Sequence, residues 1–258
     1  MKRIVLTLSL IMGAACLASA QETSVVPVTA DPVYGVKGRF SAEVQQNLGL
    51  FCDLKLREEF RTASAGKDDF RKLHSTLAFS YAPLQYFKLG ASYTYIGVFK
   101  SEFENRHRFR LSATGQVKFG AAALSLKETL QLTHYTRDLN IYQKPHNPLE
   151  LKSALKFSYN FKPVGLKPYL EAEMRHCFNA VKWESLPTLS YSDAYMNRVR
   201  LSLGMEWKIN RQNILDFYTL WDYSFDKDID AKRSGGLKSV TYYNGYTLSF
   251  GIAYKFKH

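Results

Sequence analysis

The stretch RHRFRLSATGQVKF, from Arg106 to Phe119, alternates two kinds of side chain along its whole length. Successive side chains of a β-strand point to opposite faces, so a period of two predicts a strand with two unlike faces. The first face carries His107, Phe109, Leu111, Ala113, Gly115, Val117 and Phe119, and the second carries Arg106, Arg108, Arg110, Ser112, Thr114, Gln116 and Lys118. We therefore expect a long strand with one apolar face and one basic, polar face.

The same alternation recurs on both sides of this stretch, from Tyr34 to Phe256. It predicts eleven strands, at 34–48, 50–61, 72–81, 87–95, 106–119, 122–135, 149–162, 166–179, 195–209, 213–225 and 240–256. Tight turns are expected at 47–49, 83–86, 120–121, 162–165 and 210–213, with longer polar loops between them. Short turns on one rim and longer loops on the other are typical of outer-membrane barrels, whose short rim faces the periplasm.

Strand length and aromatic placement favour a membrane barrel over a soluble sandwich or lipocalin-like barrel, whose apolar face would point inward. Most of the predicted strands run to about 11 to 15 residues, whereas soluble sheets use about 5 or 6 and tilted membrane strands about 9 to 11. Apolar-face aromatic residues gather near both strand ends, as in interfacial girdles, and the chain finishes on the alternating Tyr254-Lys255-Phe256. We expect an all-β fold, a transmembrane antiparallel up-and-down β-barrel.

The number of strands follows from parity. Single-chain bacterial barrels have even strand numbers, and the strand from Tyr34 would run from the loop rim to the short-turn rim. A preceding strand in the opposite direction is therefore expected, and residues 23–30, interrupted by Pro27, are the candidate. This predicts about 12 strands; the alternative is a periplasmic tail with a different strand count or orientation.

The N-terminus has the pattern of an export signal. Lys2 and Arg3 precede an apolar segment at 4–15, and the small residues 18–20 form a cleavage site, so residues 1–20 are predicted to be a signal peptide and 21–258 the barrel. The alternative is a lipoprotein acylated at Cys16. Export to the outer membrane of a Gram-negative bacterium argues against nucleic acid as a partner, although the net charge is +12.

The polar face of the predicted strands is rich in charge, and in a barrel it would face the lumen. The candidate lumen-lining residues are Lys37, Arg39, Arg57, Glu59, Arg106, Arg108, Arg110, Glu171, Glu173, Arg198 and Arg200. One interpretation is a porin-like channel for small anionic solutes, since rings of Arg and Lys select anions. The other is a closed structural or surface-interaction barrel, whose interior is filled by a salt-bridged ladder.

Four residues interrupt the outward apolar face. Glu58 and Glu128 stand where lipid-facing residues are expected; either the predicted register is locally wrong or they serve an oligomer contact. His107 and His134 would lie opposite each other at the loop rim if 120–121 forms a two-residue turn. They are either a metal or lipid-headgroup site or simply polar rim residues.

No catalytic, cofactor or metal constellation stands out in the sequence. Barrel phospholipases and lipid A deacylases carry a His-x-Ser arrangement on the outer wall, and this chain lacks it. His74-Ser75 would place its two side chains on opposite faces, and His134-Tyr135-Thr136 has no serine. We expect no enzyme activity and no cofactor. The expected partners are outer-membrane lipid and, during biogenesis, the barrel-assembly machinery; the oligomeric state stays open.

Several segments share the texture of a known family. The runs are LKLREEFR, FRKLHSTLAFSYAPLQYFKLGASYTY, LKSALKFSYNFKPVGLKPYLEAEMRH and MNRVRLSLGMEWKINRQNILDFYTLWDY. From about Phe40 to Phe256 the chain resembles the outer-membrane barrel family catalogued as domain of unknown function 2490. The resemblance rests on strand and hairpin texture. It implies an outer-membrane barrel without an assigned activity and provides no catalytic residues to transfer.

Overall fold

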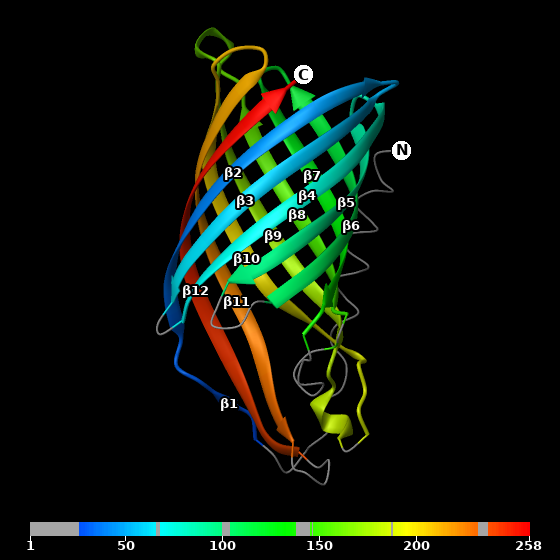
Figure 1. The fold of residues 1–258 in the computed structure, drawn as a ribbon, viewed down its shortest axis with the longest axis vertical. Coiled ribbons are helices and arrows are strands. Elements are labelled where there is room, and N and C mark those ends of the chain that lie inside the picture. Colours follow the sequence, from blue (N-terminus) through cyan, green and yellow to red (C-terminus); the bar gives the residue numbers. More distant parts are fainter. Residues whose placement is uncertain are drawn as a thin grey trace.

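The computed structural model describes residues 26–258 except 66–67, 100–103, 138–144, 146, 187 and 232–236, so the predicted signal peptide at 1–20 lies outside the described residues. The described chain forms one twelve-stranded sheet that curls into a barrel (Figure 1). The strands are β1 (Val28–Thr29), β2 (Val33–Gly49), β3 (Cys52–Ala65), β4 (Asp68–Leu84), β5 (Phe87–Phe99), β6 (Glu104–Phe119), β7 (Ala122–Tyr135), β8 (Leu149–Tyr159), β9 (Leu166–Ala180), β10 (Asp193–Lys208), β11 (Asn213–Ala231) and β12 (Leu237–Lys257). Two 3-10 helices, η1 (Lys162–Val164) and η2 (Trp183–Ser185), lie in connections, and no described helix has the length and hydropathy to cross a membrane.

The barrel is closed by the eleven strands β2 to β12. Neighbours in sequence pair in antiparallel orientation, and β12 pairs with β2 in parallel, from Gly245 opposite Val33 to Lys257 opposite Gln45. The prediction of an all-β, up-and-down antiparallel barrel with about 12 strands is confirmed. The predicted direction of the first strand is wrong, because β1 also runs parallel to β12, in line with β2.

This parallel closure explains why no strand in the opposite direction is needed. In a meander with an odd number of strands, the first and the last run in the same direction, so they can pair only in parallel. The two-residue β1 then uses the part of β12 that lies before Gly245, with Val28 opposite Thr241. Pro27 precedes β1 and does not interrupt it.

The short connections meet at one rim, which we call the short-turn rim; it lies at the top of Figure 1. The β6–β7 hairpin turns at 120–121 as predicted, with Gly120 at φ 63°. The first tight turn lies later than the predicted 47–49, because β2 continues to Gly49 and the chain turns at Leu50 and Phe51 with φ 46° and 65°. Positive φ is rare for such side chains, which is why the pattern of residue types did not indicate this turn.

Burial in the barrel is inverted relative to a soluble protein. Polar-face residues are buried in the interior; Gln131 is 0 % exposed and Asp222 3 % exposed. Apolar-face residues are exposed on the outer wall; Leu111 is 63 % exposed and Phe109 51 % exposed. The alternation therefore has its polar side inward, which excludes the sandwich or lipocalin-like alternative with an inward apolar face.

A small hydrophobic cluster lies at the opposite rim, the loop rim. Val181, Trp183, Ile229 and Val240 pack together, covered by Leu186, Leu189, Leu237 and Tyr242. This packing lengthens β11 beyond its predicted end at residue 225, since the polar segment 226–230 contributes Ile229 to the cluster. The extended hairpin also holds the pair Asp230 and Lys238, whose 2.7 Å hydrogen bond raises the pKa of the Lys238 ammonium group.

The two outward carboxylates of the sequence are genuine features of the wall. Glu58 lies directly opposite Ser75 on the next strand and accepts a 2.7 Å hydrogen bond from its hydroxyl. Glu128 lies opposite Ser153 and accepts a bond of the same length. The interpretation of a local register error is wrong, because each glutamate has a partner at the matching position of its neighbour.

Candidate functional site

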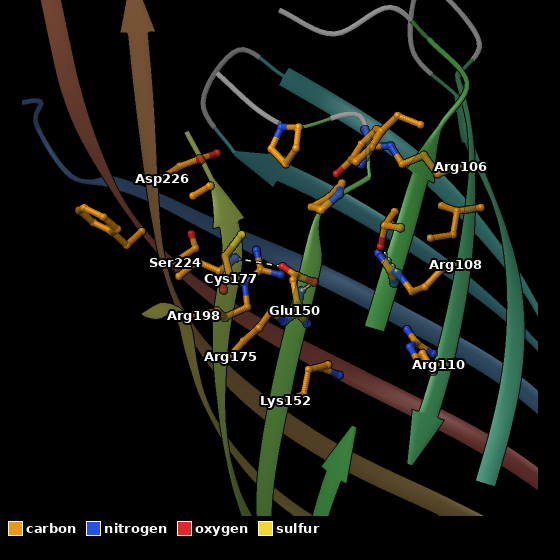
Figure 2. A pocket seen from close by; sticks show the side chains of 18 of the residues that line it. Arg106, Arg108, Arg110, Glu150, Lys152, Arg175, Cys177, Arg198, Ser224 and Asp226 are labelled. Atoms are coloured by element: carbon orange, nitrogen blue, oxygen red, sulfur yellow. Dashed lines mark hydrogen bonds and ion pairs between the residues drawn. The ribbon is translucent and has the colours of Figure 1, made fainter. Parts of the chain in front are cut away.

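The polar lumen face encloses two adjoining cavities in the barrel. The loop-side chamber, of about 350 Å³, is lined by Arg106, Arg108 and Arg110 on one side and by Lys152, Arg175 and Arg198 on the other (Figure 2). The central chamber, of about 370 Å³, is lined by Arg39, Arg57, Glu59, Glu171, Glu173 and Tyr218. Both share a boundary layer made by Arg61, His74, Arg110, Lys152 and Arg200.

Each of the eleven residues proposed from the sequence has a definite place in this arrangement. Five line the loop-side chamber: Arg106, Arg108, Arg110, Arg198 and Arg200. The central chamber takes Arg39, Arg57, Glu59, Glu171 and Glu173. Lys37 lines neither cavity, and its ammonium group donates a 3.2 Å hydrogen bond to Thr247. Cys177 faces the loop-side chamber, whereas Cys52 has the outward phase, and both cysteines are free.

One wall of the lumen is an ion-pair ladder, a name we keep for Lys152, Glu173, Arg175, Arg198, Arg200 and Asp222 on β8 to β11. The strand register creates it: Lys152, Arg175 and Arg198 lie opposite one another in one row. Glu173, Arg200 and Asp222 form the next row. A row of three cations therefore lies beside a row in which Arg200 stands between two carboxylates.

The distances show that each cation of the ladder contacts at least one carboxylate. Glu173 lies 3.1 Å from the Lys152 ammonium and 3.2 Å from the Arg200 guanidinium. Asp222 lies 3.3 Å from both Arg198 and Arg200. Arg200 is thus forked between two carboxylates, the geometry for which a planar guanidinium is suited. Each of the four cations of this wall therefore contacts a carboxylate, with Glu150 as a further partner of Arg175 at 3.4 Å.

The facing wall is different, and we call Arg106, Arg108 and Arg110 of β6 the arginine row. Arg106 pairs with Glu104 at 2.9 Å. Arg108 instead donates to the Thr133 hydroxyl at 3.2 Å, and Arg110 donates to the Gln131 amide oxygen at 2.9 Å. Among the residues that the structure describes, no carboxylate lies within 4 Å of either guanidinium.

The neutral surroundings of the arginine row follow from the sequence of its two neighbours. On the β5 side, Arg108 lies opposite Thr94 and Arg110 opposite Ser92. On the β7 side the partners are Thr133 and Gln131. Both neighbouring strands thus place uncharged side chains against the arginines, so their positive charge is directed into the chamber.

A cluster of polar contacts joins β9 to β12 on the short-turn side of the lumen, a feature that sequence reasoning missed. The Lys255 ammonium bridges Glu206 at 2.8 Å and Asp216 at 2.9 Å. The Tyr169 hydroxyl donates to Asp216 at 3.0 Å, and its ring lies against Gly204 of the next strand. A Cβ at Gly204 would lie 2.5 Å from the tyrosine ring, so only glycine fits there. Aromatic residues within the polar phase were the available signal.

His74 is a further lumen residue that the sequence analysis did not predict, since this histidine was considered only as part of His74-Ser75. Its side chain is 5 % exposed, lies in the boundary layer of both chambers, and has no hydrogen-bond partner for Nε2 among the described residues. The imidazole lies opposite Glu59 on β3 and Ile96 on β5. A buried ring nitrogen without a partner is unusual, because such groups lose the hydrogen bonds they make in water.

The two outward-facing histidines lie opposite each other on β6 and β7, as the two-residue turn at 120–121 requires. His107 and His134 lie opposite each other with ring centroids 6.3 Å apart. Each Nδ1 bonds a neighbouring polar group, the Tyr93 hydroxyl at 2.7 Å and the Asn147 side chain at 2.8 Å. No group of three metal-ligating side chains occurs in the described part of the chain. The arrangement fits polar rim residues held by their own neighbours.

One protein family matches most of this sequence. The sequence matches the family described as "Protein of unknown function (DUF2490)" over residues 36–233, which run from β2 past the end of β11. A search of curated proteins finds no match. Because the matched region covers most of the chain and all but the last strand of the closed barrel, the protein belongs to the DUF2490 family.

Proposed function

We propose that this chain is an outer-membrane β-barrel whose lumen admits small anionic solutes, a porin-like role. The observation that carries the proposal is the arginine row, since Arg108 and Arg110 face a cavity without a carboxylate beside them. Rings and rows of Arg and Lys favour anions, because the positive potential in a narrow lumen attracts counter-charge.

The inverted burial supports the membrane location. Exposed Leu, Val and Phe side chains cover the outer wall along the strands, and water is a costly environment for such a surface. A closed sheet satisfies all its backbone hydrogen bonds between strands, which a bilayer requires. Exposed aromatic side chains near the strand ends, such as Tyr34 and Phe178 toward the loop rim and Trp207 and Tyr254 toward the short-turn rim, fit the two lipid interfaces.

A second candidate function is a closed structural barrel. The ion-pair ladder and the Lys255 bridge to Glu206 and Asp216 favour it, because paired charged side chains on neighbouring strands occupy the interior and need no passing solute. In that case the lumen would bind ions without passing them. We propose no enzyme activity for either candidate. Bilayer lipid and the barrel-assembly machinery are the proposed partners.

Conductance of the refolded protein in planar bilayers distinguishes these candidates. The porin-like role predicts discrete current steps with a reversal potential on the chloride side in a KCl gradient. Absence of current at every voltage, from protein shown to be folded, would reject the pore and leave the closed barrel. Folding is checked by gel mobility that changes on boiling, and the location by finding the native protein in the outer-membrane fraction.

A further inference from the structure

We propose that the loop-side chamber is a binding site for a compact polyanion, a small molecule with at least two anionic oxygen groups of the phosphate or carboxylate kind. The inference deepens the proposed function and rests on it, since a solute must enter the lumen from the loop rim to reach the chamber. It adds that the solute binds at a preformed site in the loop-side chamber before it moves further along the lumen.

The balance of charge around the chamber indicates a multivalent ligand. Nine Lys and Arg side chains line the cavity: Arg61, Lys72, Arg106, Arg108, Arg110, Lys152, Arg175, Arg198 and Arg200. Six carboxylates line it or pair with these cations: Glu59, Glu104, Glu150, Glu173, Asp222 and Asp226. Two of these carboxylates, Glu59 and Glu104, also pair with Arg57 and Arg137, which do not line the cavity, so the lining keeps an excess of positive charge. Buried charges require compensation, and one monovalent anion would supply only part of it.

Unpartnered polar atoms provide a second and independent observation. Three residues that line the chamber each have a buried nitrogen without a hydrogen-bond partner among the described residues: Nε2 of His74 and Nε of Arg106 and Arg175. Arg175 is 8 % exposed and extends from the wall opposite the arginine row (Figure 2). A ligand with several acceptor oxygens could satisfy donors from both walls at once, which a single chloride ion does less well.

The dimensions agree with a ligand of metabolite size. The cavity of about 350 Å³ lies at the lower end of the range for small-molecule sites. At roughly 30 Å³ per water molecule it has room for about ten waters, enough for a pyrophosphate or a small phosphate ester. The size of the loop-side chamber therefore suits the capture of such a ligand.

Calorimetric titration of the refolded, detergent-solubilised chain at low salt tests this site, with pyrophosphate as the probe and acetate as the monovalent reference. We expect one pyrophosphate per barrel, bound at least about tenfold more tightly than acetate, a difference of about 1.4 kcal/mol or more. The R108Q/R110Q double variant should weaken pyrophosphate binding by at least about tenfold, because it removes the two uncompensated charges.

The matched control removes two lumen cations elsewhere. Lys55 and Lys88 pair with Glu43 and Asp53 and line neither chamber, so K55Q/K88Q should bind pyrophosphate like the wild type. Every variant is first shown to be folded by heat-dependent gel mobility. Equal affinity for acetate and pyrophosphate, wild-type affinity in R108Q/R110Q, or equal weakening in K55Q/K88Q would overturn the site.

Failure of the site and failure of the pore give different results. An anion-selective current without pyrophosphate binding overturns the polyanion site and leaves the proposed function intact. Pyrophosphate binding by a barrel that carries no current supports the site and rejects the porin-like role.

Discussion

The arginine row and the ion-pair ladder face each other across one chamber. Both contain arginines, but the arginines of the two walls have different partners. In the ladder, Arg200 is forked between Glu173 and Asp222. In the row, Arg108 and Arg110 rest on a hydroxyl and an amide. An arginine whose carboxylates come from the wall is a structural element. An arginine held by neutral groups keeps its charge available to a solute.

The difference has an energetic origin. Moving a guanidinium out of water is costly, and a nearby carboxylate offsets the cost when the geometry is good. The ladder meets this condition with contacts of 3.1 to 3.5 Å. The row does not, so part of its desolvation cost is unrelieved until an anion enters. The arginine row, which is energetically less favourable when no anion is bound, is therefore the better candidate for anion binding.

Breaking the ladder should have the largest effect. Glu173→Ala leaves Lys152, Arg175 and Arg200 without the carboxylate they share, and removing one partner of a buried ion pair costs about 3 to 5 kcal/mol. We expect a loss of this size in the free energy of unfolding, measured by tryptophan fluorescence in denaturant with lipid vesicles. Exposed Glu184 on η2 provides the control, and Glu184→Ala should change the value by less than about 0.5 kcal/mol. Equal effects of the two variants would refute the ladder as a stabilising unit.

Replacing arginine by lysine tests the fork itself and should have a smaller effect. Arg200→Lys keeps the charge but loses the planar guanidinium, which contacts Glu173 through one terminal nitrogen and Asp222 through the other. We therefore expect a cost of about 1 to 2 kcal/mol. Arg108→Lys gives up only its bond to Thr133 and should stay within about 0.5 kcal/mol. The same unfolding assay compares them. A larger cost at Arg108 than at Arg200 would contradict the distinction between row and ladder.

Converting part of the row into a ladder should have the smallest effect on stability. Ser92→Asp places a carboxylate directly opposite Arg110 on β5, and opposite charges across a strand pair contribute about 0.2 to 1 kcal/mol. We expect a gain within this range together with weaker anion selectivity in bilayer recordings. Ser92→Asn, which adds similar bulk without charge, serves as the control. Unchanged selectivity in Ser92→Asp would show that Arg110 does not set the potential of the lumen.

The arginine row was accessible from sequence because its members lie on one strand. A period of two places Arg106, Arg108 and Arg110 on one face whatever the neighbours are. The fold class, the eleven long strands and the inward direction of charge followed from the same local pattern. Whether an arginine is compensated did not, because the answer depends on the register of strands that are far apart in sequence.

Other features lay beyond local pattern for similar reasons. The parallel pairing of β12 with β2 joins the two ends of the chain, and no residue type marks it. The hydrogen bond of Glu58 depends on Ser75 in the next strand, so the glutamate alone looked like an error of register. The unpartnered Nε2 of His74 is a property of its surroundings on three strands. In each case the feature depends on residues of a neighbouring strand, which the local sequence pattern does not contain.

The central claim is that the arginine row, and not the ladder, gives the lumen its preference for anions. The most direct measurement is the reversal potential in a KCl gradient, compared between wild type, R108Q/R110Q and R198Q/D222N, the last of which removes a compensated pair from the ladder. We predict a reversal potential on the chloride side for the wild type, a shift toward zero in R108Q/R110Q and a value close to the wild type in R198Q/D222N. An unchanged reversal potential in R108Q/R110Q, or a shift as large in R198Q/D222N, would contradict this account.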